Sequence, residues 1–188
     1  MGSEGASVLT VSGLPGSGTT TACRLLGKAL GWPHVNAGQI FRELAAGSGL
    51  TLAELGRRAE EDGEIDRQLD ARMVATARRL GRVVLEGRLT GWMASRHGLP
   101  ALRTWLAAPL EVRARRVSRR DGQPLAQATR AMQEREASEA RRYRLFHQIE
   151  IADLSVYDLV VDTGSLPAAR VAQQVLRRLG VEAKEVRE

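Results

Sequence analysis

A glycine-rich segment near the start of the chain has the residue types and spacing of a phosphate-binding loop. Its residues are Gly13, Leu14, Pro15, Gly16, Ser17, Gly18, Thr19, Thr20 and Thr21. The Walker A pattern is Gly, four residues, Gly, Lys and then Ser or Thr, and the chain departs from it by having Thr19 in place of the lysine. Glycines let successive backbone N–H groups point at one anion, and a helix N-terminus adds positive partial charge. We therefore predict that this loop binds phosphate and that the Thr20 hydroxyl ligates Mg²⁺ directly.

The sequence on either side of the loop supports this interpretation. An apolar run over Val8–Val11 precedes the loop and a helical pattern over Thr21–Leu30 follows it, which gives the strand, loop and helix that the motif requires. An ordinary turn between a strand and a helix is the alternative, but such a turn does not need three glycines in six positions.

The missing lysine raises the question of which side chain supplies its charge. The chain has two lysines, Lys28 and Lys184. Lys28 lies about 13 Å along the helix from Thr19 at 1.5 Å per residue, which is too far to substitute, and Lys184 lies in the polar tail. Any side-chain cation on the transferred phosphate must therefore be an arginine.

An acidic residue at the end of an apolar run is the second candidate for chemistry. Val83–Leu85 reads as a strand, Glu86 ends it, and Arg88 follows two residues later. In the Walker B arrangement such a carboxylate orients water on Mg²⁺ beside the phosphate loop, and ligands of open α/β sheets bind at the carboxyl ends of the strands. A strand-end carboxylate paired with an arginine is the alternative. Because the chain already carries a phosphate loop, we favour the metal site.

Further arginines could complete a clamp on phosphate. Arg42 falls in the first turns of a predicted helix and can bind a phosphate with two hydrogen bonds. Four residues of a later helix share one face, namely Arg135, Ser138, Glu139 and Arg142. Arg116 and Arg120 share another face. A solvated, salt-bridged surface is the usual meaning of such patterns, but at least two of these arginines are needed to neutralise the transferred phosphoryl group.

The histidines and the cysteine suggest no covalent or metal chemistry. His34, His97 and His147 are scattered, and we expect all three to be structural or exposed. Cys23, the single cysteine, excludes a disulfide framework, suits a reducing cytoplasm and reads as a small core residue on the first helix. Cysteine and histidine pairs at zinc spacing are absent, so we expect no structural metal.

Strand-like and helical segments alternate along the chain, which predicts an α/β fold of three layers around a five-stranded parallel sheet. The predicted strands are Val8–Val11, His34–Val35, Val83–Leu85, Leu102–Leu106 and Leu159–Val161. Residues 50–80 read as helix with a break at Asp62 and Gly63, and Thr51 with Glu54 forms a capping box at its start. A helix opens at Pro109 and ends near Asp121, and the charged stretch over 124–148 predicts a projecting lid or hairpin.

Length and charge narrow the class of protein. The 188 residues suit one domain with a sizeable core, and neither a membrane-spanning run nor a signal-peptide pattern is present. The net charge of +6 comes almost entirely from arginine. It is mixed with carboxylates, and few aromatic residues could stack on bases, so we do not expect nucleic acid as a partner. We expect a cytoplasmic monomer that binds no membrane.

These motifs together resemble the archaeal-type cytidylate kinases, a branch of the P-loop nucleoside monophosphate kinases. The resemblance covers about Val8 to Val175 in one continuous order. Its matching segments are 12–21, 36–42, 59–62, 64–66, 86–92, 108–113, 135–143 and 153–160. It implies a three-layer P-loop NTP-hydrolase fold in one domain, 1–188, with monophosphate-binding helices over about 37–80 and a short lid over about 120–145.

The resemblance also implies an activity and a set of site residues. The activity is phosphoryl transfer from ATP, with Mg²⁺, to CMP and dCMP. The implied CMP-binding residues are Gln39, Arg42, Arg88, Gly91 and Trp92. The implied catalytic residues are Glu86, Arg88, Arg135 and Arg142, with Glu86 holding Mg²⁺ through water. Arg116 and Arg120 would join Arg135 and Arg142 over the phosphate chains, and Asp162–Gly164 would lie near the adenine of ATP.

Two departures from the family pattern keep alternatives open. Thr19 replaces the general P-loop lysine, and Gln39 stands where the family often has aspartate. A kinase for another small acceptor, such as AMP, UMP or shikimate, is one alternative, because the chemistry of the motifs does not select the base. A nucleotide-binding regulator with an impaired site is the other, although Thr20, Glu86 and Arg88 argue against it.

Overall fold

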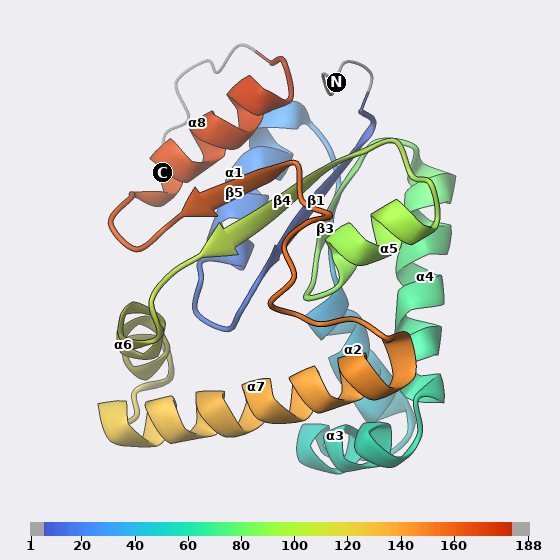
Figure 1. Ribbon diagram of the computed structural model, residues 1–188, viewed down its shortest axis with the longest axis vertical. Coiled ribbons are helices and arrows are strands. Elements are labelled where there is room, and N and C mark those ends of the chain that lie inside the picture. Colours follow the sequence, from blue (N-terminus) through green and yellow to red (C-terminus); the bar gives the residue numbers. More distant parts are fainter. Residues whose placement is uncertain (1–5, 182–188) are drawn as a thin grey trace.

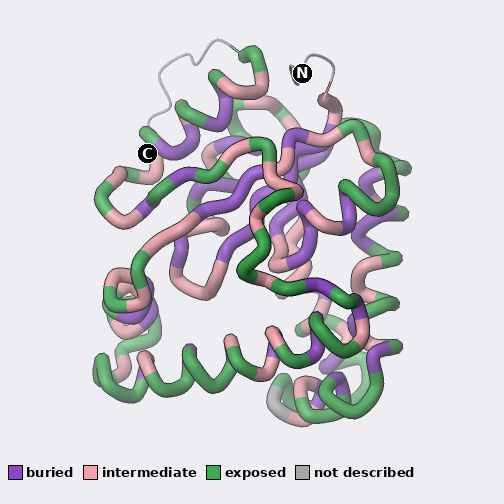
Figure 2. The backbone as a smooth tube through the Cα atoms, viewed as in Figure 1, coloured by how far each residue is buried: buried purple, intermediate pink, exposed green. Residues whose placement is uncertain are grey.

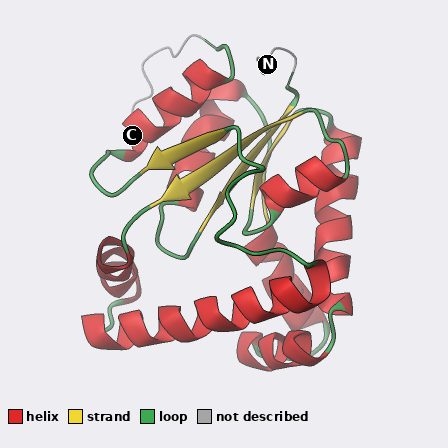
Figure 3. Cartoon of the chain, in the orientation of Figure 1, coloured by secondary structure: helices red, strands yellow, loops and turns green. Residues whose placement is uncertain are grey.

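The computed structural model describes residues 6–181, which form a parallel sheet with helices on both faces (Figures 1 and 3). The strands are β1 (Val8–Gly13), β2 (His34–Asn36), β3 (Val83–Glu86), β4 (Ala101–Ala107) and β5 (Leu159–Asp162). Their order across the sheet is β2-β3-β1-β4-β5, and every neighbouring pair is parallel. The predicted α/β class and the five predicted strands are confirmed.

The helices follow the sequence prediction closely. They are α1 (Thr19–Leu30), α2 (Ala37–Gly47), α3 (Leu52–Glu61), α4 (Glu64–Leu80), α5 (Thr90–Arg96), α6 (Leu110–Asp121), α7 (Leu125–His147) and α8 (Ala168–Arg178). The predicted break at Asp62 and Gly63 separates α3 from α4. The predicted capping box is formed, because the Thr51 N–H donates to Glu54 Oε2 at 2.7 Å and the Glu54 N–H donates to Thr51 Oγ1 at 3.2 Å. The first helix begins two residues earlier than predicted.

The core lies on both faces of the sheet, whose strands are mostly buried in Figure 2. Side chains of α1 and α8 pack on one face against Leu9, Val11 and Val84. The other face includes Val83 and Leu85 and packs against α4. Because successive strand residues point to opposite faces, the residue that follows Leu85 points toward α1. The fold thereby brings the predicted acidic residue to the helix that begins at the phosphate loop.

The charged helix α7 does not project into solvent. It runs past the carboxyl ends of the strands, from α6 to the region of α3 and α4 (Figure 1). Its N-terminal half packs on α6 through Ala128 and Met132, and Tyr143 packs with Val74 of α4 and Met93 of α5. Both ends of α7 are therefore anchored by apolar packing, and its middle reaches the rest of the protein through the polar side chains of Glu136, Ser138 and Glu139.

Candidate active site

The loop between β1 and α1 presents backbone donors that have no protein partner. Gly16 and Gly18 have φ of +80° and +88°, in the left-handed region that favours glycine. A β-carbon at Gly16 would also lie 2.6 Å from the carbonyl oxygen of Arg113. Among the described residues, none accepts a hydrogen bond from the N–H groups of Gly16, Gly18, Thr19 or Thr20. These free donors at a helix N-terminus have the geometry that the predicted phosphate cradle requires.

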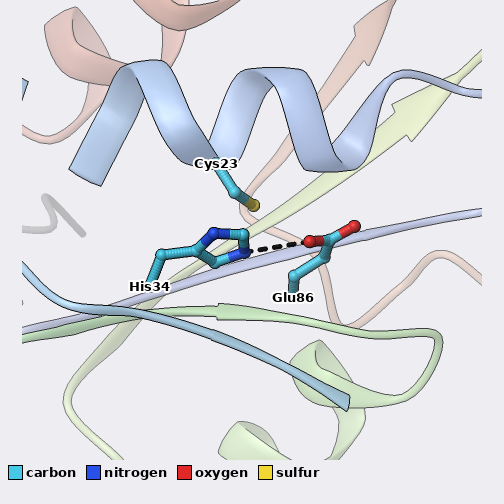
Figure 4. Close-up of side chains that lie close together, drawn as sticks. All are labelled: Cys23, His34 and Glu86. Carbon is cyan, nitrogen blue, oxygen red and sulfur yellow. Dashed lines mark hydrogen bonds and ion pairs between the residues drawn. The ribbon is translucent and has the colours of Figure 1, made fainter. Parts of the chain in front are cut away.

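Glu86 lies behind this cradle and accepts hydrogen bonds on both carboxylate oxygens. Its Oε1 accepts from the hydroxyls of Thr19 at 2.8 Å and Thr20 at 2.6 Å. Its Oε2 accepts from the Asn36 amide and lies 2.9 Å from Nε2 of His34 (Figure 4). Asn36 pairs with Glu86 in the register of β2 and β3, and His34 shares the face of Asn36. The threonine that replaces the lysine is therefore tied to the acidic residue at the strand end.

This network keeps the buried carboxyl group ionised. Burial raises the pKa of Glu86, but hydrogen bonds from His34, Thr20 and Thr19 outweigh burial and leave the pKa below its ordinary value. Cys23 of α1 lies beside His34 and Glu86 (Figure 4), with the ligand atoms of all three within 4.8 Å. Burial, and then the charge of Glu86, raises the pKa of Cys23. The thiol is thus a neutral core group, as the sequence predicted.

The roles of His34 and Asn36 were not found from the sequence. His34 was expected to be structural or exposed, without an evident partner. A signal was present, because residues two apart on a strand share a face. Using it required knowing that β2 neighbours β3, and nothing in the residue pattern determines that order of strands.

Three arginine side chains donate hydrogen bonds to backbone carbonyl oxygens of the loop. They are Arg88 to Gly13 at 2.8 Å, Arg113 to Pro15 at 3.1 Å and Arg116 to Gly16 at 3.3 Å. Arg116 also donates to the Thr163 carbonyl at 2.5 Å, and the Thr163 hydroxyl donates to the Ser17 carbonyl at 2.9 Å. The loop is therefore fixed by its carbonyl groups while its N–H groups remain free, and the segment after β5 lies against it.

Arg113 is the member of this group whose role was not predicted from the sequence. Its side chain is 6% exposed, pairs with Glu136 of α7 and donates to the Ala108 carbonyl at 3.0 Å. It therefore joins the loop, α6 and α7 at one point. The signal that could have found it is its position three residues before Arg116, which places both on the same face of α6.

Arg120 was expected beside Arg116 over the phosphates, and the structure does not bring it to the loop. Its guanidinium donates to Asp121 at 2.7 Å, and its side chain is 69% exposed. Arg120 shares the face of Arg116 but lies one turn, about 6 Å, farther along α6. This extra turn directs it to solvent and away from the loop.

A cavity of about 390 Å³ lies between the end of β3, helices α2 to α4 and the middle of α7. This volume suits a small organic ligand. Its charged lining includes four of the predicted arginines, namely Arg42, Arg88, Arg135 and Arg142. Phe41, Leu69 and Met73 contribute apolar lining. The structure therefore collects arginines from α2, α7 and the strand end around one space beside the phosphate loop.

Glu139 of α7 holds two of these arginines. It accepts hydrogen bonds from Nε of Arg88 at 2.9 Å and from Nε of Arg135 at 2.8 Å. Burial raises the pKa of Glu139, but the charges of Arg88 and Arg135 outweigh burial and lower it. The sequence placed Glu139 and Arg135 on one face but left the charge partner of Arg88 unidentified. A bound phosphate would compete with Glu139 for both guanidinium groups.

Three residues predicted to contact the acceptor are not among those that line the cavity. Gln39 is exposed and donates to Glu43 at 3.3 Å. A β-carbon at Gly91 would lie 2.3 Å from the Tyr157 ring, so this glycine serves close packing. Trp92 packs against the apolar cluster around α4 and α5, and its ring lies 5.7 Å from the Arg96 guanidinium. The structure brings Arg42 and Arg88 to the cavity but leaves these three outside its lining.

Arg142 lies at the α4 end of the cavity. It was expected to close over the phosphates, but its Nε lies 3.1 Å from Oδ2 of Asp66 on α4. Seven residues, or about 10 Å of helix, separate it from Arg135. One turn along α4 from Asp66, Asp70 Oδ2 lies 3.5 Å from Nδ1 of His147. Burial, and then the charge of Asp66, raises the pKa of Asp70 to about 7.

Thr20 and Glu86 have the chemistry of a Mg²⁺ site. Mg²⁺ prefers oxygen ligands, commonly with several waters retained. The Thr20 hydroxyl donates its proton to Glu86, which leaves its oxygen lone pairs for a cation. The lowered pKa keeps the Glu86 carboxylate ionised beside it. The residues present therefore fit the predicted arrangement of one hydroxyl ligand and one carboxylate that acts through water.

Comparisons with known proteins give the family and the fold neighbours of this chain. A sequence model of the cytidylate kinase-like family matches residues 8–165. The chain is 47% identical over 157 residues to the cytidylate kinase of Methanocaldococcus jannaschii, covering 83% of this chain and 88% of that protein. It is 49% identical over 156 residues to the cytidylate kinase of Methanococcoides burtonii, covering 83% and 87%. The shikimate kinase of Acinetobacter baumannii has a similar fold, with a TM-score of 0.60, 19% identity and 93% of each chain covered.

Proposed function

Because the chain belongs to the cytidylate kinase-like family, we propose that it transfers the γ-phosphoryl group of ATP to CMP or dCMP. The observation that carries this proposal is the position of Arg88. Its guanidinium donates to the carbonyl of Gly13 in the phosphate loop and also lines the arginine-rich cavity. One side chain thus joins a site suited to a triphosphate with a site suited to a monophosphate.

The donor nucleotide is proposed to bind along the loop from Gly13 to Thr21. The free N–H groups of Gly16, Gly18, Thr19 and Thr20 would receive its phosphate oxygens. Arg116 holds the loop against Thr163, which supports placing the adenine near the segment 162–164. This arrangement leaves the terminal phosphate directed at the cavity beside Arg88.

The acceptor is proposed to place its phosphate between Arg42 and Arg88. An oxygen of this phosphate attacks the γ-phosphorus of ATP, the bond from that phosphorus to the β-phosphate oxygen breaks, and ADP and CDP are formed. No enzyme nucleophile is needed, since positioning and charge neutralisation account for most of the catalysis of phosphoryl transfer. Arg135 lies on the same cavity and shares Glu139 with Arg88. These two arginines are proposed to supply the charge that the P-loop lysine supplies elsewhere.

A magnesium ion is proposed to bind at Thr20, with Glu86 acting through water. When bound, the ion neutralises charge on the donor phosphates. Thr19 does not disturb this site, because the hydroxyls of Thr19 and Thr20 both donate to the same oxygen of Glu86. His34 and Asn36 hold the opposite oxygen and so fix the carboxylate plane.

The regions around the cavity are proposed to close during the reaction. Residues 37–80 would form the acceptor-binding region, and residues 120–145, including most of α7, would form the lid. The pairing of Glu139 with Arg88 and Arg135 supports this, because a phosphate can replace the carboxylate on both arginines. Closure would exclude water and direct transfer to CMP.

The helices over residues 6–181 include none with the length and apolar character of a membrane-spanning segment.

The test is a coupled assay of ADP formation with ATP and Mg²⁺ and with CMP, dCMP, UMP, AMP or GMP as the acceptor. Turnover with CMP and dCMP well above that with the other acceptors is the expected result. A reaction without acceptor measures ATP hydrolysis, and Glu86→Gln provides an inactive control. Turnover with a different acceptor alone would keep the kinase and reject the cytosine specificity. Absence of turnover on every acceptor would reject the enzyme.

A further inference from the structure

Asp66 and Arg142 form a buried ionic pair that lacks hydrogen bonds. The two residues are 4% and 8% exposed. Their atoms approach to 3.1 Å, but the geometry leaves Asp66 Oδ2 and Arg142 Nε without a hydrogen-bond partner. Over residues 6–181, neither the Asp66 carboxylate nor the Arg142 guanidinium forms a hydrogen bond to another protein group. Leaving such groups unpaired away from water costs free energy. A polar ligand that forms hydrogen bonds with both groups would offset this cost.

Both side chains line the cavity, and the phosphate-binding chemistry does not use them. Arg88 and Arg135 are linked through Glu139, whereas Arg142 lies one turn beyond Glu139, on the side of α4. Glu139 is paired with two arginines and Asp66 with one, so the neighbourhood of Asp66 is less suitable for the negatively charged phosphate end of the acceptor. The neutral end of a nucleotide, its base, is the part that suits this end of the cavity.

The order of donor and acceptor groups on the pair matches one pyrimidine edge. Cytosine presents two acceptors, O2 and N3, followed by a donor, the 4-amino group, whereas uracil presents an acceptor, a donor and an acceptor. A guanidinium offers donors in a planar fork, and a carboxylate offers acceptors alone. A guanidinium beside a carboxylate therefore complements cytosine across its whole edge and meets uracil with two mismatches.

We infer that Asp66 and Arg142 together read the base of the acceptor nucleotide, with Arg142 donating to O2 and N3 and Asp66 accepting from the 4-amino group. Their apolar neighbours in the cavity lining, Leu69, Met73 and Met93, form surface on which a flat ring can pack. This inference rests on the proposed function. It gives Arg142 a role at the base of the acceptor in place of the predicted role at the phosphates.

Asp70 is the carboxylate that could compete for this role. It also lines the cavity, and its Oδ2 has no hydrogen-bond partner. Asp70 lies 3.5 Å from His147, not beside the guanidinium, so it cannot form the combined edge. Burial raises the pKa of both carboxyl groups, but Arg142 lowers the pKa of Asp66 in part, whereas the charge of Asp66 raises that of Asp70 further. Recognition of the base is therefore assigned to Asp66 together with Arg142.

The experiment compares kcat/KM for CMP, UMP and the 5′-monophosphate of 2-pyrimidinone riboside, which lacks the 4-amino group. Wild-type enzyme is expected to prefer CMP over the analogue by roughly 10–100-fold, the range for a lost hydrogen bond to a buried group. Asp66→Asn should remove most of this preference and raise the ratio of UMP to CMP turnover, because its amide can donate to O4 of uracil. Arg142→Lys should lower kcat/KM for CMP mainly through KM, since the planar fork is lost.

Two controls fix what each result means. Arg144→Lys alters an exposed arginine of the same helix that pairs with Glu150, and it should leave all three ratios unchanged. Asp70→Asn should leave the preference for CMP over the analogue in place. Should Asp66→Asn fail to fold, Arg142→Lys and the wild-type discrimination against the analogue still decide the outcome.

The result that overturns the inference differs from the one that overturns the proposed function. Wild-type turnover of CMP, with unchanged ratios in Asp66→Asn and an unchanged KM for CMP in Arg142→Lys, would reject these residues as the base-recognition pair while keeping the kinase. Loss of the preference in Asp70→Asn alone would transfer the role to Asp70 and reject the assignment. Absence of CMP turnover in the wild type would reject the proposed function itself.

Discussion

The most informative perturbation is the removal of Arg113, because this side chain joins three parts of the site. It donates to the carbonyls of Pro15 in the phosphate loop and of Ala108 after β4, and it pairs with Glu136 of α7. Arg113→Met keeps much of the apolar stem and removes all of these hydrogen bonds. The variant should therefore be less stable and should hold ATP less well.

The expected size follows from burial. The side chains of Arg113 and Glu136 are 6% and 19% exposed, so removing the arginine leaves a carboxylate largely out of water. Breaking a buried pair in this way costs about 3–5 kcal/mol. For a chain of this size that corresponds to a fall in Tm of roughly 6–20 °C. The double variant Arg113→Met with Glu136→Leu should recover part of the loss, since it leaves no unpaired charge.

The assay is thermal unfolding combined with titration of an ATP analogue. Arg115→Met is the matched control, because Arg115 lies on the same helix and pairs with Glu111 at 49% and 72% exposure. Such an exposed pair contributes about 0–1 kcal/mol. Equal Tm values for Arg113→Met and Arg115→Met, with unchanged affinity for the analogue, would refute the role of Arg113 as the brace of the loop.

Three further predictions concern the cavity. Arg88→Ala should reduce kcat/KM for CMP by about 10²–10³-fold, and steady-state kinetics that match the wild type would remove it from the site. Arg135→Ala should lower kcat more than it raises KM, because charge neutralisation peaks in the transition state, and a change in KM alone would contradict this. Burial raises the pKa of Asp70 to about 7, so the folded state disfavours its ionised form and wild-type stability should fall as the pH rises from about 4 through 7. Asp70→Asn should have the higher Tm at pH 8 and the same Tm near pH 4, and a constant difference across this range would argue against a raised pKa.

Local sequence patterns were enough to predict the elements that carry the site. The spacing from Gly13 to Thr20 predicts a loop between a strand and a helix whatever the rest of the chain does, because both the glycine conformations and the helix start are local. Glu86 was predicted in the same way, as the acidic end of an apolar run. Such short-range signals therefore predict the helices and strands, the loop and the acidic residue at the strand end.

The contacts between distant segments could not be predicted in this way. Asn36 and Glu86 meet because β2 lies beside β3, and Glu139 meets Arg88 because α7 crosses below the strand ends. Arg142 was predicted over the phosphates from the family resemblance, because helical periodicity gives its face but not which neighbour that face meets. The side chain beside it in the structure, Asp66, comes from a helix about 80 residues away in sequence, whose packing depends on the whole fold.

The measurement that tests the central claim most directly follows the γ-phosphate itself. ATP labelled at the γ-phosphate is incubated with the protein, Mg²⁺ and CMP, and the products are separated by chromatography. We predict that the label appears in CDP, which would show that a P-loop with Thr19 in place of lysine supports transfer when arginines line the acceptor cavity. Label recovered as inorganic phosphate, or retained in ATP, would contradict the account.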